Sequence, residues 1–105
     1  MSRYEEFRRR ILERAATELN RRFSVTTRGL ANNHGIPESH IREELFRLAE
    51  LGLISLFAWD GERERPYNEW PDKASLFANT TDKGHVHIGL LSAGGELLSK
   101  DPAFG

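Results

Sequence analysis

The stretch SVTTRGLANNHGIPESHIREELFRLAELGLI, residues 24–54, carries the pattern that decides the fold. It predicts two helices joined by a tight turn. Thr26 or Thr27 caps a short first helix, and Gly35 ends it in the left-handed conformation that glycine adopts without strain. A second helix is predicted over residues 37–51, because its apolar side chains recur at helical spacing and form one buried stripe: Ile41, Leu45 and Leu48.

Another amphipathic helix is predicted upstream, over residues 3–20. Ser2 is placed to cap its start, with Glu5 three residues later as the capping-box partner. Steps of three and four residues put one apolar face toward the core: Tyr4, Phe7, Ile11, Ala15 and Leu19. The three helices together predict a compact helical core.

The second half of the chain is predicted to be rich in strands. ISLFAW (54–59) and HVHIGLL (85–91) are aromatic and β-branched, and Asp60-Gly61 is a strong turn signal. The segment 60–84 is too long for a hairpin tip, so we expect it to pack on the domain as an inserted lobe. Its anchors are expected to build a second small core against the sheet: Trp59, Tyr67, Trp70 and Phe77.

Two further helices are expected. One lies inside the inserted lobe, from Pro71 to about Asn79, and Ser92 caps the other, with a frayed tail after it. Alternation along the strand at 85–91 puts Val86, Ile88 and Leu90 on one face and His85 and His87 on the opposite face.

Composition places the chain among globular single domains. It has 105 residues, 15 Lys and Arg against 16 Asp and Glu, and a net charge of -1, so residues 1–105 are expected to fold as one unit. No apolar run is long enough to cross a membrane. The charged N-terminus lacks an export signal and cysteine is absent, so a cytoplasmic location is expected.

The helix–turn–helix over residues 26–51 resembles the winged-helix family of transcription regulators, which includes GntR-like and MarR-like proteins. The residues that carry this resemblance are Leu30-Ala31, Gly35-Ile36, Ile41, Leu45, Leu48 and Gly52-Leu53-Ile54, and LLSAGGELL (90–98) is similar to the segment that closes the wing in such proteins. It implies an α+β winged-helix domain: a three-helix core, a wing of two or three strands with an inserted lobe over residues 54–91, and a short C-terminal helix. Leading helices of this family commonly dimerise, which implies a homodimer through residues 3–20.

The resemblance also implies sequence-specific binding of double-stranded DNA, with helix 37–51 in the major groove and the wing beside it. On this hypothesis the phosphates are contacted by Thr26, Thr27, Arg28 and Ser39. The bases are contacted by His40 and Arg42, and Arg47 projects from the same helix. The DNA backbone is followed from the wing by Arg63 and Arg65. Structural roles compete with these: Arg42 can pair with Glu38, Arg47 with Glu43 or Glu50, and Thr26 can act only as a cap.

Charge is unevenly distributed along the chain. Residues 1–28 carry a net +4, residues 29–57 a net -2 and residues 58–105 a net -3. Helix 37–51 holds four glutamates against two arginines, and its outward stripe is predicted to be Ser39, Glu43, Phe46, Arg47 and Glu50. An acidic face of this kind repels a duplex unless other arginines compensate. It favours the alternative of a protein–protein interaction module that uses Phe46 and the aromatic lobe and does not bind DNA.

Catalytic and metal chemistry find little support in the sequence. It has no nucleophile elbow and no glycine-rich phosphate loop, so an enzyme is not expected, and no cofactor is predicted. His85 and His87 have a spacing that can ligate zinc, but no third ligand is evident, so no metal site is predicted. His34 stands at the end of a predicted helix, where interaction with the helix dipole accounts for it.

Overall fold

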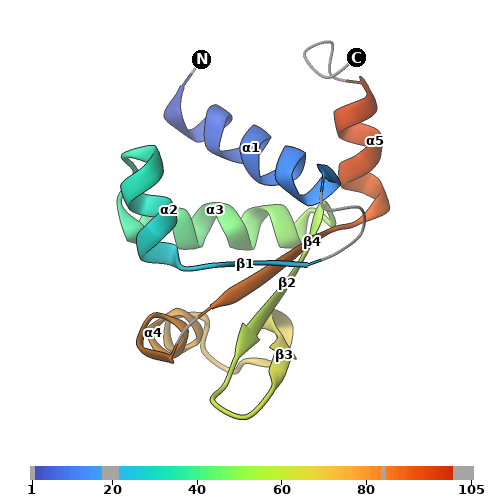
Figure 1. Ribbon diagram of the computed structural model, residues 1–105. Helices are drawn as coiled ribbons and strands as arrows, with labels where there is room; N and C mark the ends of the chain where they lie inside the picture. The colour runs from blue at the N-terminus through green and yellow to red at the C-terminus, as the bar shows by residue number, and fades with distance from the viewer. Residues whose placement is uncertain (1, 18–21, 84, 101–105) are drawn as a thin grey trace.

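A computed structural model describes residues 2–17, 22–83 and 85–100 of the protein. The described chain is an α+β domain of five α-helices and a four-stranded antiparallel sheet (Figure 1). Its elements in order are α1 (Arg3–Thr17), β1 (Phe23–Val25), α2 (Thr27–His34), α3 (Glu38–Glu50), β2 (Ile54–Trp59), β3 (Glu64–Pro66), the single 3-10 turn η1 (Tyr67–Glu69), α4 (Lys73–Lys83), β4 (Val86–Leu90) and α5 (Ser92–Lys100).

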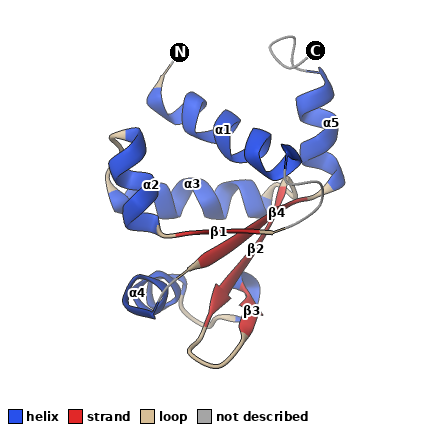
Figure 2. Cartoon of the chain, in the orientation of Figure 1, coloured by secondary structure: helices blue, strands red, loops and turns tan. Residues whose placement is uncertain are grey.

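The strands form one sheet in the order β1-β4-β2-β3, with every neighbouring pair antiparallel (Figure 2). Three of these strands, β2, β3 and β4, lie within residues 54–91, where two or three strands were expected. The chain turns back after β2 and adds β3, which was not foreseen, at the sheet edge. Asp60 makes this turn: its carboxylate accepts the backbone N–H groups of Glu62 and Arg63, while Gly61 has a φ of 106°. Such local hydrogen bonds and a positive φ favour Asp-Gly at tight turns.

Local signals between β1 and α3 confirm the predicted caps. The Thr26 hydroxyl accepts the backbone N–H of Gly29 at 3.0 Å, and Gly35 ends α2 with a φ of 63°. Pro37 lies just before α3, with an extended backbone, so the helix begins at Glu38. The predicted stripe of α3 is buried: Ile41, Leu45 and Leu48.

One continuous hydrophobic core joins the helices, the sheet and the inserted lobe. From α1 it includes Phe7, Ile11 and Ala15, and from the lobe it includes Leu76 and Phe77, with Phe77 at 0% exposure. The expected second core was therefore wrong: the same face of the sheet packs against α3 and α4. Leu19 and the predicted tail after Lys100 lie outside the described residues.

The inserted lobe contains α4, which begins two residues after Pro71 and extends beyond Asn79 to Lys83. Asp72 explains the start, because its carboxylate accepts the backbone N–H of Ala74 at 2.9 Å. In Figure 1, α1, α2 and α3 gather toward one end of the sheet and α4 and β3 toward the other. None of the described helices combines the length and the apolar character that a membrane span requires.

Candidate functional site

The start of α3 is tied to α2 by a polar network. The Thr27 side chain is 1% exposed, and its hydroxyl donates to Glu38 at 2.7 Å. The guanidinium of Arg42 forms an ion pair with the same carboxylate at 3.5 Å and lies 5.9 Å from the ring centre of Phe77. Two residues expected at the DNA surface are thus held by intramolecular contacts, and Thr27 is buried.

Three of the four glutamates of α3 have cationic partners. Glu44, a residue only 9% exposed, accepts two hydrogen bonds from Arg8 of α1, at 2.6 and 3.1 Å, and this bonding raises the pKa of the arginine. Glu50 pairs with Lys73 of α4, and Glu38 pairs with Arg42. Within the part of the chain that the structure describes, only Glu43 of these four lacks such a partner, so the exposed edge of α3 is close to neutral.

The open edge of α3 consists of Ser39, His40, Glu43 and Arg47, all exposed. The Nδ1 atom of His40 hydrogen-bonds to the hydroxyl of Tyr4 at 2.6 Å, which anchors the ring beside α1. No carboxylate among the described residues pairs with Arg47, so its pairing with Glu43 or Glu50 is not observed. This edge presents a cation, a carboxylate, a hydroxyl and an imidazole to solvent.

The opposite flank of α3 is covered by the inserted lobe, so the prediction that Phe46 projects outward was wrong. Its ring packs at 4.8 Å, edge to face, on Phe77 and at 5.6 Å on Tyr67. The ammonium of Lys73 lies 5.1 Å from the centre of the same ring. Burial of aromatic surface explains why the lobe packs on Phe46. Because the lobe covers it, Phe46 is not part of an exposed aromatic patch of the kind expected for an interaction module.

Exposed cationic side chains also lie outside α3, at the start of α2 and in the turn before β3. Arg28, at the start of α2, and Arg63, in the turn before β3, are exposed, and neither has a carboxylate partner among the described residues. Arg65 instead pairs with Asp60. The backbone N–H groups of Arg63 and Glu62, followed by Arg65, lower the pKa of Asp60 to about 2, so the turn keeps its negative charge at neutral pH.

His87 of β4 and His85, just before it, do not form a metal site in the described structure. His87 bonds to Glu64 of β3, and the same carboxylate pairs with Arg22, whose guanidinium lies 3.9 Å from the ring centre of Phe57. His85 is exposed. Within residues 2–17, 22–83 and 85–100, no three His, Cys, Asp or Glu side chains are grouped so as to hold a metal.

The pairs Arg8–Glu44 and Lys73–Glu50 were missed by sequence reasoning, because the partners lie 36 and 23 residues apart. One signal was present for Glu44: it stands three residues after the buried Ile41 and four before the buried Leu48, which places it at the core side of the helix. No comparable pattern identifies the partner arginine.

Comparison with known proteins gives no assignment: no protein-family model matches the chain, and no significant match is found to a curated protein or to a solved structure.

Proposed function

We propose that this domain is a winged-helix transcription regulator that binds double-stranded DNA with the open edge of α3. The observation that carries the proposal is the pairing of Glu38, Glu44 and Glu50 with cations of this chain. This pairing removes most of the repulsion that four glutamates would exert on a duplex, because each carboxylate has a positive charge beside it. Arg47 then lies on a nearly neutral surface.

The order of the elements supports the same proposal. A helix, a short strand and two helices are followed by strands that place β4 between β1 and β2. In a winged helix, the hairpin beyond the second helix of the motif flanks the DNA, and here β2 and β4 would form it. Its tip is replaced by β3 and the inserted lobe, which packs back onto α3.

Three exposed cations, Arg28, Arg47 and Arg63, have proposed roles. Arg47 enters the major groove with Ser39 and His40, where a guanidinium can bond to guanine in a bidentate manner. Arg28 contacts a phosphate at the start of α2, and Arg63 contacts the backbone beside the groove. Arg42 and Thr27 are structural in this proposal, because Glu38 holds both.

The test is fluorescence anisotropy with a labelled duplex of mixed sequence, measured over a range of salt concentrations. The two phosphate contacts of Arg28 and Arg63 give a slope of about -1.8 in log K against log salt, which is a loss of about 12-fold in affinity between 50 and 200 mM. Replacing Arg28 or Arg63 by Ala removes one contact, so the loss over this range falls to about 3.5-fold. Arg22→Ala is the matched control, since Arg22 is an exposed arginine outside α1 that is paired with Glu64.

The contribution of Arg47 is tested by selecting duplexes from a random pool. Arg47→Ala is expected to relax the base preference at one position, at a cost of about 1–3 kcal/mol. Absence of duplex binding at 50 mM salt would overturn the proposal and leave the protein-interaction module, with a partner other than DNA.

A homodimer through α1 remains part of the proposal, since two copies would double the DNA contacts. The described apolar side chains of α1 face the core, and its exposed positions include Glu6, Arg10 and Glu13. Charged contacts between copies would therefore hold the dimer. Sedimentation velocity over a concentration series tests it, and a monomer at every concentration would rule it out.

A further inference from the structure

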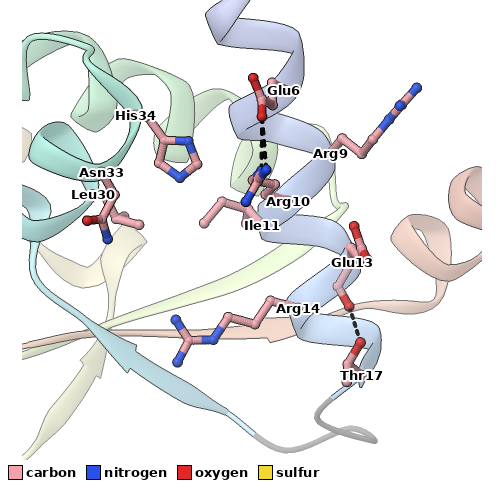
Figure 3. Close-up of a pocket in the computed structure, with 10 residues that line it drawn as sticks. All are labelled: Glu6, Arg9, Arg10, Ile11, Glu13, Arg14, Thr17, Leu30, Asn33 and His34. Atoms are coloured by element: carbon pink, nitrogen blue, oxygen red, sulfur yellow. Dashed lines mark hydrogen bonds and ion pairs between the residues drawn. The ribbon is translucent and has the colours of Figure 1, made fainter.

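A groove runs between α1 and α2, apart from α3 and the inserted lobe. Its volume is about 770 Å³, within the range of about 300–1,000 Å³ that is typical of small-molecule sites. The lining extends from Glu6 to Thr17 on α1, which is about 16 Å along a helix, and from Leu30 to His34 on α2. Figure 3 shows the two walls facing each other.

The floor of the groove is apolar, with a cation at one end. Ile11 of α1 and Leu30 of α2 are both buried and lie on the lining. The guanidinium of Arg14 lies 4.5 Å from the ring centre of Phe23 and extends from α1 toward α2 (Figure 3). Among the described residues no carboxylate pairs with Arg14. One face of the planar guanidinium is thus occupied by the ring, while its N–H donors have no anion.

The wall on α2 supplies neutral polar groups. His34 packs edge to face on Phe7 with ring centres 5.2 Å apart, and burial together with the charge of Arg10 lowers its pKa, despite an opposing effect of Glu6. The lowered pKa favours the neutral imidazole at pH 7. Beside it, Asn33 points into the groove with an amide that can both donate and accept (Figure 3).

The other charged groups of the lining leave Arg14 as the cation available to a ligand. Arg10 is paired with Glu6 at 3.1 Å. Arg9 and Glu13 extend away from α2 in Figure 3, toward the rim. An anion entering the groove consequently finds a positive charge at one end of an apolar floor and uncharged donors along one wall.

We propose that the groove between α1 and α2 binds a small organic anion, a carboxylate or a phosphate monoester attached to a flat apolar body. The anion bonds to the forked N–H donors of Arg14, which match the geometry of either group. The flat body covers Ile11 and Leu30, and its polar edge contacts Asn33. A duplex is a poorer occupant, because Glu13 on the rim repels its regularly spaced phosphates.

The test uses four probes and amide chemical shifts of the full-length protein measured by two-dimensional NMR. Benzoate and phenyl phosphate carry both features, benzamide lacks the charge, and inorganic phosphate lacks the flat body. On this proposal, at least one of the two aromatic anions causes saturable shifts of the amide signals of Leu30, Asn33 and His34. Benzamide and inorganic phosphate are expected to bind at least ten-fold more weakly. The stronger aromatic anion identifies the natural anionic group.

Variants locate the site within the groove. Arg14→Ala is expected to weaken the aromatic anion by about 10- to 100-fold, the range for losing hydrogen bonds to a charged group. Asn33→Ala, at an exposed position that does not support the core, is expected to weaken it by a few fold. Arg28→Ala is the matched control and leaves the affinity unchanged, because Arg28 does not line the groove.

Three results would overturn the proposal. If benzamide binds as tightly as the aromatic anions, the groove is an apolar pocket that does not recognise charge. If inorganic phosphate binds as tightly as the aromatic anions, the groove recognises charge and not the flat body. If no probe shifts any amide signal, the groove is not a binding site. Anion binding and DNA binding use different arginines, so either can fail alone. The inference therefore does not depend on the proposed DNA contacts.

Discussion

The Phe77→Ala substitution tests whether the inserted lobe and the helical core form one cooperative unit. Phe77 belongs to α4, has 0% exposure and packs edge to face on Phe46 of α3 at 4.8 Å. Truncation at this position leaves a void between α4 and α3, because neither element can close over it without disturbing the other. The substitution therefore weakens the contact that holds the lobe on α3.

The expected cost follows from burial and packing. Replacing a fully buried phenylalanine by alanine costs about 3–5 kcal/mol, since the transfer free energy of the ring and the void both contribute. The lost aromatic pair accounts for about 0.5–1.5 kcal/mol of this amount. A domain of this size is stabilised by about 5–15 kcal/mol in total, and each kcal/mol shifts Tm by about 4–8 °C. A decrease in Tm of about 12–40 °C is expected.

Urea denaturation provides the measurement, followed by two signals. Far-UV circular dichroism reports the helices, and tryptophan fluorescence reports the sheet edge and the lobe through Trp59 and Trp70. Wild type and Phe77→Ala are both expected to show coincident transitions with an unchanged slope, as two-state unfolding requires. The control is Leu97→Ala, a 48% exposed leucine of α5, with an expected change within about 0.5 kcal/mol.

A loss smaller than about 1 kcal/mol for Phe77→Ala would refute the reasoning, because it lies below the range measured for filled cores. Separate transitions by the two signals in the wild type would refute it in another way, since the lobe would then unfold apart from the helices. In either case Phe46 would not be held under a stable cover, and the aromatic interaction surface would regain its basis.

Other substitutions test the polar contacts. Thr26→Ala removes the acceptor of the Gly29 N–H and is expected to cost about 1 kcal/mol in urea denaturation, and an equal stability would show that the cap is dispensable. Glu44→Gln leaves Arg8 without its charged partner and is expected to lower the free energy of unfolding by about 1.5–3 kcal/mol. In a double-mutant cycle, the double variant with Arg8→Met is expected to lose less stability than the sum of the two single variants, and equality with that sum would show that the two residues are not coupled. Because the pKa of Asp60 is lowered from 3.8 to about 2, its carboxylate contributes its full stabilisation above pH 3.8. The difference in stability between the wild type and Asp60→Ala is therefore expected to shrink as the pH falls from 3.8 to about 2, and a difference that stays constant over this pH range would contradict the lowered pKa.

The elements between β1 and α3 were predictable because their signals are local. Thr26 and Gly35 determine the ends of α2 through hydrogen bonds and backbone angles within five residues. The apolar spacing of Ile41, Leu45 and Leu48 orients α3 without knowledge of any other element. For the same reason the turn at Asp60-Gly61 was found, while β3 was missed, because ERP carries no apolar alternation and is a strand only through its pairing with β2.

The candidate site was less predictable, because contacts distant in sequence determine which side chains remain exposed. Phe46 has the spacing of an outward residue, yet Phe77, 31 positions later, covers it. Arg42 was expected to contact bases, and the structural alternative of pairing with Glu38 is the one observed. The outward direction predicted for Arg47 is confirmed, and Arg28 is exposed as well, but no sequence pattern separates these two arginines from their partnered neighbours.

The charge of α3 shows how tertiary structure changes the meaning of a sequence. Its four glutamates suggest an acidic surface, but the cations that pair with three of them come from α1, from α4 and from α3 itself. Lys73 reaches Glu50 only while the lobe is packed on Phe46, so the docking of the lobe and the neutrality of the open edge depend on the same contact. The insertion thus covers one flank of α3 and also reduces the charge that would keep a polyanion from the other flank.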